Sequence, residues 1–306
     1  MTDQSVGVIG VGRLGSDVAF TLAERDLCDI VLYDKDTEKA AYLASDLRDT
    51  AFGHEYPLRV SWTADLAELN RCSVILIAAG MRMDGNTSRE ELFRENRLIA
   101  EEVARTFIGS SILFVVASDP VDLITAELTR LLKLPSSRVM GVGGVVDAFR
   151  VRYAIAETLS YSPDIIRSHV VGPQGRESEV LWDYTSVNGV PLKELTDGDT
   201  IEKTRELLNS ESHSKTWLMA ESASRYTPAL ACLELIRCLV QDDRRVLSVT
   251  VSCPELTGVP GVAMSVPAVV GRFGAERLLL PKLEDESNER LKKLAESFAK
   301  TLEELG

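Results

Sequence analysis

Short apolar runs alternate with amphipathic stretches through residues 1–143. The apolar runs contain many Val and Ile residues and predict buried strands, whereas the stretches between them have apolar residues at helical spacing. The predicted strands lie at 6–9, 29–33, 58–62, 73–79, 111–117 and 138–142. The predicted helices lie just after position 12 and at 37–49, 88–107 and 121–132. Strands separated by helices imply right-handed crossovers, so this half predicts a Rossmann-type α/β fold with a doubly wound parallel sheet.

Residues 144–306 follow a different pattern, in which helices and strands are grouped. Predicted helices lie at 145–159 and across 201–242, with a break or a new start at Pro228; strand-like runs lie at 165–171 and 246–272. Asn188 and Gly189 predict a hairpin turn. The last helix has an apolar face made of Leu291, Leu294, Phe298, Leu302 and Leu305. We therefore expect two domains, 1–143 and an α+β domain at 144–306.

A glycine-rich turn follows the first strand and predicts dinucleotide binding. Gly10, Gly12 and Gly15 have the spacing G-x-G-x-x-G between a strand and a helix, where backbone N–H groups and the helix N-terminus can approach a pyrophosphate. Asp34 ends the second strand, nineteen residues after Gly15. A carboxylate there accepts hydrogen bonds from the adenosine ribose and repels a 2′-phosphate, so the sequence predicts NAD rather than NADP.

Composition and charge exclude several classes of partner. A net charge of −13 over 306 residues argues against nucleic acid and anionic membrane surfaces, so an anionic substrate must be met by local arginines. No apolar run is long enough to cross a membrane, and the chain enters a strand without a signal peptide. Five scattered cysteines predict reduced thiols in a cytoplasmic protein, and three histidines without ligand spacing predict no metal site.

Four motifs in order along the chain resemble the L-lactate/malate dehydrogenase family. Residues 80–89, GMRMDGNTSR, resemble the loop that closes over substrate in that family. Residues 118–122, SDPVD, resemble its Ser-Asn-Pro-Val-Asp, and residues 147–152, DAFRVR, resemble its Asp-Ser-x-Arg-x-Arg helix. Residues 172–178, GPQGRES, occupy the place of its Gly-Glu-His-Gly-Asp-Ser. The resemblance implies hydride transfer between NAD and a small 2-hydroxy or 2-oxo carboxylate, with NAD bound by 1–143 and substrate by 144–306.

The same resemblance implies roles for individual residues. Arg150 and Asp147 lie three residues apart on one predicted helix and therefore share a face. The resemblance implies that Arg150 holds the carboxylate of the substrate, because a guanidinium can bind a carboxylate through two hydrogen bonds. Arg89 follows the loop and can stabilise a developing alkoxide. The expected catalytic residues are Gln174, Asp147, Asp119 and Arg89, and the expected substrate-binding residues are Arg150, Arg82, Met83 and Ser224. The expected cofactor contacts are Gly10, Gly12, Arg13, Leu14, Gly15, Asp34, Ala79, Gly80, Asn96 and Ala117.

The chain departs from the family where chemistry is expected. Gln174 stands at the place of the acid/base histidine, and a carboxamide cannot donate or accept a full proton at physiological pH. Asp119 replaces an asparagine, and with a pKa raised by burial it is the best replacement donor. Arg176 replaces an aspartate, and we expect it to pair with Asp147 or Asp119. Met83 replaces the Gln of lactate enzymes or the Arg of malate enzymes, which favours an apolar substrate side chain.

Three readings remain open from the sequence. The first is an NAD-dependent dehydrogenase of a 2-hydroxy acid, and its variant acts on an imine or amine, where a carboxylate would stabilise a cation. The alternative is a catalytically inactive NAD-binding relative with a sensor or interaction role, because fold does not fix function. The resemblance also implies a homodimer or homotetramer, built through the helix at 37–50.

Overall fold

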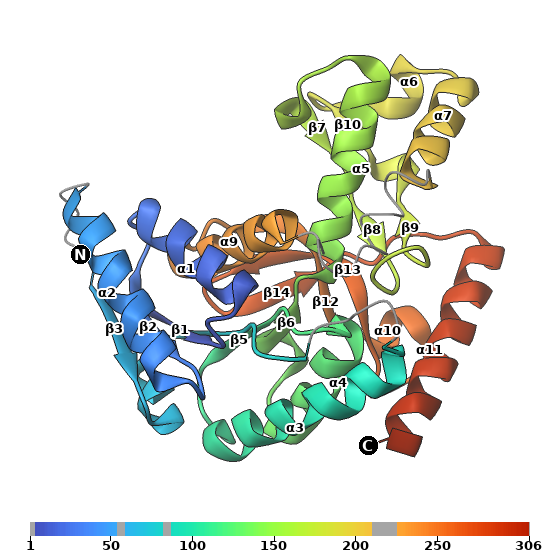
Figure 1. Cartoon of the computed structure of the whole chain (residues 1–306). Helices are drawn as coiled ribbons and strands as arrows, with labels where there is room; N and C mark the ends of the chain where they lie inside the picture. The colour runs from blue at the N-terminus through green and yellow to red at the C-terminus, as the bar shows by residue number, and fades with distance from the viewer. Residues whose placement is uncertain (1–3, 54–58, 82–86, 210–224, 306) are drawn as a thin grey trace.

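A mixed sheet forms the centre of the molecule in the computed structural model, which describes residues 4–53, 59–81, 87–209 and 225–305 (Figure 1). In these residues the sheet has nine strands in the order β14-β13-β12-β6-β5-β4-β1-β2-β3. Its parallel strands are β1 (Ser5–Ile9), β2 (Asp29–Tyr33), β3 (Val60–Thr63), β4 (Val74–Ile77), β5 (Leu113–Val116) and β6 (Val139–Gly141). The order reverses between β1 and β4, which confirms the doubly wound sheet that the alternating pattern predicts.

Helices cover both faces of this sheet (Figure 1). The helices of one face are α1 (Arg13–Glu24), α2 (Thr37–Gly53) and α9 (Tyr226–Gln241), and those of the other are α3 (Arg89–Phe107), α4 (Val121–Leu132) and α11 (Asp285–Leu305). Ser88 caps α3, since its hydroxyl accepts a hydrogen bond from the backbone N–H of Glu91 at 3.0 Å. The start of α3 is therefore set by a local signal that is visible in the sequence.

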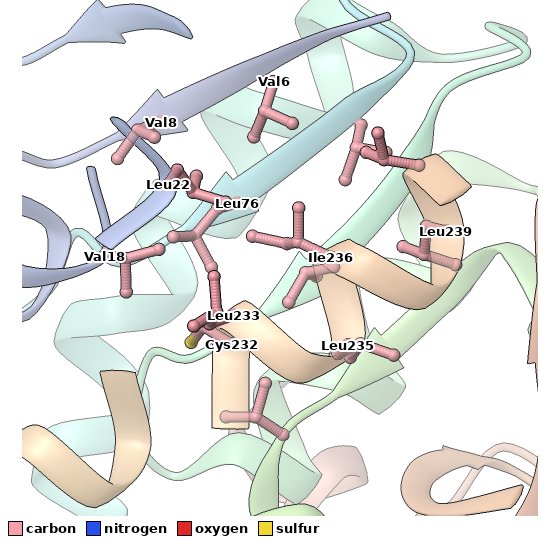
Figure 2. Close-up of a cluster of buried hydrophobic side chains, with 14 of the residues drawn as sticks. Val6, Val8, Val18, Leu22, Leu76, Cys232, Leu233, Leu235, Ile236 and Leu239 are labelled. Carbon is pink, nitrogen blue, oxygen red and sulfur yellow. The ribbon is translucent and has the colours of Figure 1, made fainter. Parts of the chain in front are cut away.

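The first face buries strand and helix side chains together. Figure 2 shows Val6 and Val8 of β1 and Leu76 of β4 gathered against Leu22 of α1 and Ile236 of α9. All five are fully buried or nearly so. Because alternate residues of a strand point to opposite faces, Ile75 and Ile77 belong to the second core, under α3 and α4.

Three strands of the second half extend the sheet of the first. They are β12 (Arg245–Ser252), β13 (Ala263–Gly271) and β14 (Gly274–Leu278), and they pair antiparallel with one another. β12 joins the parallel strands through Thr250, which pairs with Gly141 of β6. The sheet thus continues past the predicted boundary between 143 and 144, where α5 (Gly143–Leu159) begins, and that boundary stays a prediction.

The remaining elements build a lobe around α5 that projects from the sheet (Figure 1). They are β7 (Ile166–Arg167), β8 (Val170–Val171), β9 (Glu179–Val180), β10 (Ser186–Val187), β11 (Val190–Pro191), α6 (Leu192–Leu195) and α7 (Gly198–Asn209). α10 (Pro254–Thr257) follows β12, and 3-10 turns cover Leu66–Arg71, Ser136–Arg138, Pro163–Ile165 and Trp182–Tyr184. Asn188 and Gly189 both have positive φ, 48° and 86°, which confirms the predicted hairpin turn. The single strand predicted at 165–171 is wrong in detail, because the structure divides it into β7 and β8.

The glycine turn offers a test of the packing between β1 and α1. A Cβ at Gly15 would lie 1.9 Å from the carbonyl oxygen of Gly10, whereas a Cβ at Gly12 would meet no atom within 4 Å. We predict that Gly15→Ala lowers the free energy of unfolding by about 1–3 kcal/mol, as overpacking does, and that Gly12→Ala changes it by less than about 0.5 kcal/mol. Denaturant unfolding measures both, and equal effects of the two substitutions would contradict this packing.

Candidate active site

The glycine turn lies at the carboxyl ends of the parallel strands. There it contacts the residues that follow the two neighbouring strands, β4 and β2. Gly10 has φ +90°, and a Cβ there would lie 2.5 Å from the backbone of Ala79, beyond β4. Asp34 accepts a hydrogen bond from the backbone N–H of Val11 at 2.8 Å, so the carboxylate after β2 also fixes the turn. α1 then begins at Arg13, with Gly12 as its N-cap in open space. A pyrophosphate fits this arrangement, because a helix N-terminus and an unobstructed backbone face the same edge.

The buried side chain of Asn96 ties the loop after β4 to the loop after β5. Its Oδ1 accepts from the N–H of Met81 at 2.6 Å, and its Nδ2 donates to the carbonyl of Asp119 at 2.6 Å. A Cβ at Gly80 would lie 2.9 Å from the same Asn96 oxygen. The structure therefore gives Asn96 a role in placing Asp119, and its contact with the cofactor stays a prediction.

Two buried carboxylates hold two successive peptide groups of the loop between β8 and β9. Asp122 of α4 accepts from the backbone N–H of Gln174 at 3.0 Å, and Asp147 of α5 accepts from that of Gly175 at 2.7 Å. Thr250 of β12 donates to the other oxygen of Asp122 at 3.2 Å. We call Asp122 and Asp147 with these two amides the carboxylate clamp. The clamp fixes the loop at the position where the resemblance expects the acid/base histidine.

Each clamp carboxylate also binds an arginine. Arg150 lies 3.1 Å from Asp147, which confirms that the two side chains share one face of α5. Arg89, the first residue of α3, lies 3.3 Å from Asp122, and its guanidinium stacks 4.8 Å from the ring centroid of Phe298 on α11. The structure thus brings both predicted arginines to the same loop, through one aspartate each.

Burial and the two arginines shift the pKa values of the site carboxyl groups in opposite directions. Burial raises the pKa of Asp122 and of Asp147 to about 6, although Arg89 and Arg150 lower them. The protein atoms around Asp119 likewise raise its pKa, while the charges of Arg89 and Arg150 lower it. Asp119 still reaches solvent, so water screens these effects and its carboxyl group can exchange protons. Asp119 is thus a titratable group within the field of both arginines.

The loop after the clamp corrects one expectation. The side chain of Gln174 lies against the start of α5, 3.0 Å from the place where a Cβ of Gly143 would be. Arg176 is exposed, and among the described residues no ion pair joins it to Asp147 or Asp119. The predicted pairing of Arg176 is wrong, because Arg150 already occupies Asp147 and Gly175 takes its other oxygen.

Three predicted site residues lie outside the part of the chain that the structure describes, and three residues of the site were not predicted to belong to it. Arg82, Met83 and Ser224 fall in the segments 82–86 and 210–224, so their expected contacts with substrate stay predictions. Leu14, Ala79 and Ala117 pack against the two cores beside the glycine turn. The roles of Asp122, Thr250 and Phe298 were missed; only Asp122 carries a signal, since it closes the motif SDPVD.

Other findings concern the described part of the chain as a whole. All five cysteines are free and buried, as predicted. No helix within the described ranges is long and apolar enough to cross a membrane. Nor does that part of the chain hold a group of three His, Cys, Asp or Glu side chains suited to a metal ion.

The comparisons with known proteins agree on one family. Residues 4–141 match the family model of the lactate/malate dehydrogenase NAD binding domain, and residues 145–305 match that of its alpha/beta C-terminal domain. The malate dehydrogenase of Trichormus variabilis is 30% identical over 300 residues, which cover 97% of this chain and 93% of that protein. The L-lactate dehydrogenase of Thermus aquaticus is 29% identical over 98% of this chain and 99% of its own.

A solved structure shows the same fold. It is the lactate dehydrogenase of Cryptosporidium parvum, complexed with lactic acid and the cofactor NAD, and it superposes with a TM-score of 0.86 over 99% of this chain and 98% of its own, at 23% identity. These matches place the chain among the NAD-dependent dehydrogenases. It belongs to the lactate/malate dehydrogenase family, and NAD is its cofactor. None of them favours the inactive alternative.

The clamp predicts a characteristic dependence of stability on pH. Because burial raises the pKa of Asp122 to about 6, the folded chain binds this proton more tightly than the unfolded chain, and stability falls as pH rises from about 4 to about 6. We predict that the stability of the unaltered chain, relative to Asp122→Asn, falls by up to about 1.4 kcal/mol per pH unit across this window and is level above it.

Urea unfolding between pH 4 and pH 8 measures this difference. Asp49→Asn, at an exposed aspartate of α2, controls for the loss of one formal charge. A difference that stays constant between pH 4 and pH 6 would show that Asp122 does not titrate in the folded protein.

Proposed function

We propose that this chain is an NAD-dependent 2-hydroxy acid dehydrogenase in which Asp119, rather than a residue at position 174, exchanges the proton. Residues 1–143 would hold the cofactor and residues 144–306 the substrate. The observation that supports the proposal is the position of Asp119 in the field of both arginines and of Asp122, a carboxylate of the clamp. An inactive relative has no physical need for two arginines held in this way.

Arg150 is proposed to bind the carboxylate of the substrate. A guanidinium has five N–H donors in a planar fork, so Arg150 can hold Asp147 and also offer a pair of donors to a second carboxylate. The lactate dehydrogenase of Cryptosporidium parvum was solved with lactic acid, and a substrate of this class carries such a carboxylate. Arg89 then faces the oxygen on which negative charge develops, provided that it leaves Asp122.

The chemistry of the groups present indicates which group donates the proton in the proposed reaction. When bound, NADH supplies a hydride to the C2 carbonyl carbon of a 2-oxo acid. The carboxyl proton of Asp119 passes to the substrate oxygen in the same reduction, which leaves a 2-hydroxy acid, NAD and ionised Asp119. Solvent returns the proton, since Asp119 is exposed. Gln174 contributes only hydrogen bonds, because a carboxamide holds no titratable proton at neutral pH.

The first prediction concerns the substrate class. We expect the purified chain to oxidise NADH with 2-oxo acids, at the rates of about 1 to 10³ per second that are typical of enzymes. The assay is repeated with ammonium and with methylamine, because Asp119 also suits a cationic imine. If turnover requires an amine, the substrate is an imine or amine rather than a 2-hydroxy acid. If no turnover occurs under any condition, the result supports the catalytically inactive alternative.

The second prediction concerns Arg150. Arg150→Lys keeps the charge and loses the planar fork, so we expect KM for 2-oxo acids to rise by about 10- to 100-fold, the effect of losing one to three kcal/mol of binding. Arg152→Lys on the same helix is the matched control, since Arg152 donates to the carbonyl of Pro163. A similar KM in both variants would contradict the proposed carboxylate site.

The third prediction concerns the proton. If Asp119 donates it, then kcat/KM for reduction falls with a slope of one above the pKa of Asp119, and Asp119→Asn removes this limb and lowers kcat by about 10²- to 10⁴-fold. Gln174→His tests whether a histidine restores activity in the Asp119→Asn background. An unchanged pH profile in Asp119→Asn would exclude Asp119 as the donor.

We extend the proposal to assembly and location. A homodimer or homotetramer through α2 is supported by the exposed ring of Tyr42 on that helix, and light scattering of the chain and of Tyr42→Asp would test it. Free cysteines throughout support a reducing compartment such as the cytoplasm.

A further inference from the structure

Arg89 is held by two side chains that have no part in the proposed reaction. Its Nη2 lies 3.3 Å from Oδ2 of Asp122, whose side chain is fully buried, and its Cζ lies 4.8 Å from the ring centroid of Phe298. A cation within about 6 Å of a ring is attracted to its face, more strongly where water is excluded. Because Asp122 offsets the charge of Arg89, the arginine cannot stabilise a negative oxygen of the substrate at full strength while it stays there.

The ring of Phe298 is fixed in place by the packing of three helices. Phe298 lies on α11 with 8% of its surface exposed, and it belongs to the core under α3 and α4. Phe93 of α3 and Leu123 of α4 are part of the same core. The C-terminal helix therefore presents an aromatic face to Arg89 at a fixed position.

The position of Arg89 also has unfavourable features. Its Nε atom is buried, and the described residues provide no acceptor for the proton on it. A buried donor without a partner destabilises the arrangement that contains it. Arg89 is, in addition, the first residue of α3, where the positive end of the helix dipole disfavours a cation. The ion pair and the ring thus hold the side chain against two unfavourable interactions.

Asp122 keeps hydrogen-bond donors when Arg89 is taken away. Its Oδ2 accepts from the backbone N–H of Gln174 at 3.0 Å, and its Oδ1 accepts from the hydroxyl of Thr250 at 3.2 Å. A buried carboxylate is costly when it loses every partner, and less so when donors remain. The departure of Arg89 therefore leaves neither oxygen of Asp122 without a hydrogen bond.

We infer that Phe298 is a positioning residue that, together with Asp122, holds Arg89 in a resting position from which the arginine must be released before it acts on the substrate. The inference rests on the proposed function of Arg89. Where Arg89 is released in only a fraction of the molecules, the apparent affinity for substrate falls by that fraction. Weakening the resting contact then increases kcat/KM, whereas the loss of a merely structural side chain lowers it or leaves it unchanged.

Phe298→Leu tests the inference in the full chain with NADH, because leucine is apolar and of similar size but has no ring face. We expect kcat/KM for a 2-oxo acid to rise by about 3- to 10-fold, the effect of losing a cation–π contact. Phe298→Met, a second variant without a ring, should give a similar increase.

Two control variants make the result specific to the ring. Phe298→Tyr keeps the aromatic face and should stay within about twofold of the unaltered chain. Leu302→Ala loosens the packing of the same helix against the same core and keeps the ring, so it should not raise kcat/KM.

A double-mutant cycle shows whether the effect passes through Arg89. In an Arg89→Gln background the ring has no guanidinium to hold, so we expect Phe298→Leu to change kcat/KM by less than about twofold. The same variants are titrated with oxamate in the presence of NADH, a measurement that needs no turnover. Phe298→Leu should lower the Kd of oxamate by about 3- to 10-fold in the otherwise unaltered chain and not in the Arg89→Gln background.

The outcomes separate this inference from the proposed function. If Phe298→Leu and Phe298→Met lower kcat/KM or leave it unchanged, or if the increase persists in Arg89→Gln, then the inference is wrong while the dehydrogenase remains. An increase of the same size in Phe298→Tyr also overturns it. If no 2-oxo acid oxidises NADH, the proposed function fails, and the Kd of oxamate alone decides whether Phe298 holds Arg89.

Discussion

The carboxylate clamp is the constraint on which the site depends. Asp122 and Asp147 come from different helices, yet they bind successive amides of one loop at 3.0 and 2.7 Å. Each carboxylate is buried, so its charge is tolerated only because an arginine and backbone donors surround it. The same pairs therefore hold the loop and orient both arginines, and they oppose the burial that raises the pKa of the two aspartates to about 6.

This arrangement explains how the family's site can lose its histidine and keep its shape. In the clamp, the oxygen of Asp147 that faces the loop is taken by the amide of Gly175, so the loop conformation does not depend on a side chain at position 174. Asp119 is held separately, since Asn96 binds its carbonyl at 2.6 Å. The positions of the arginines and of Asp119 thus depend on backbone contacts, whereas the identity of residue 174 affects only the chemistry.

Much of the fold could be predicted from the sequence because its signals are local. The glycine spacing before α1 and the turn at Asn188 each act within a few residues, and the structure confirms them. The cap at Ser88 is equally local. The site was predicted only in part, since its decisive contacts join distant positions. Asp122 lies 33 residues from Arg89, 52 from Gln174 and 128 from Thr250 along the chain.

Two features of the folded chain share one physical origin, a contact between positions far apart in the sequence. The continuation of the sheet into β12 depends on the pairing of Thr250 with Gly141, for which neither segment carries a pattern. The expected pairing of Arg176 with Asp147 is plausible by charge, but in the folded chain each oxygen of that carboxylate binds another partner, Arg150 or the amide of Gly175. Both contacts join residues that are distant in the sequence, so they can be seen only in the folded chain.

In the proposed reaction Asp119 meets the reacting oxygen while Arg150 holds the carboxylate of the substrate. A crystal structure of the ternary complex with NADH and oxamate, an unreactive analogue of a 2-oxo acid, tests it most directly. We expect the oxamate carboxylate on Arg150 and an Asp119 oxygen within about 3 Å of the oxamate carbonyl oxygen, which is hydrogen-bond reach. An oxamate bound away from Arg150, or one whose carbonyl oxygen contacts Gln174 with Asp119 turned to solvent, would contradict it.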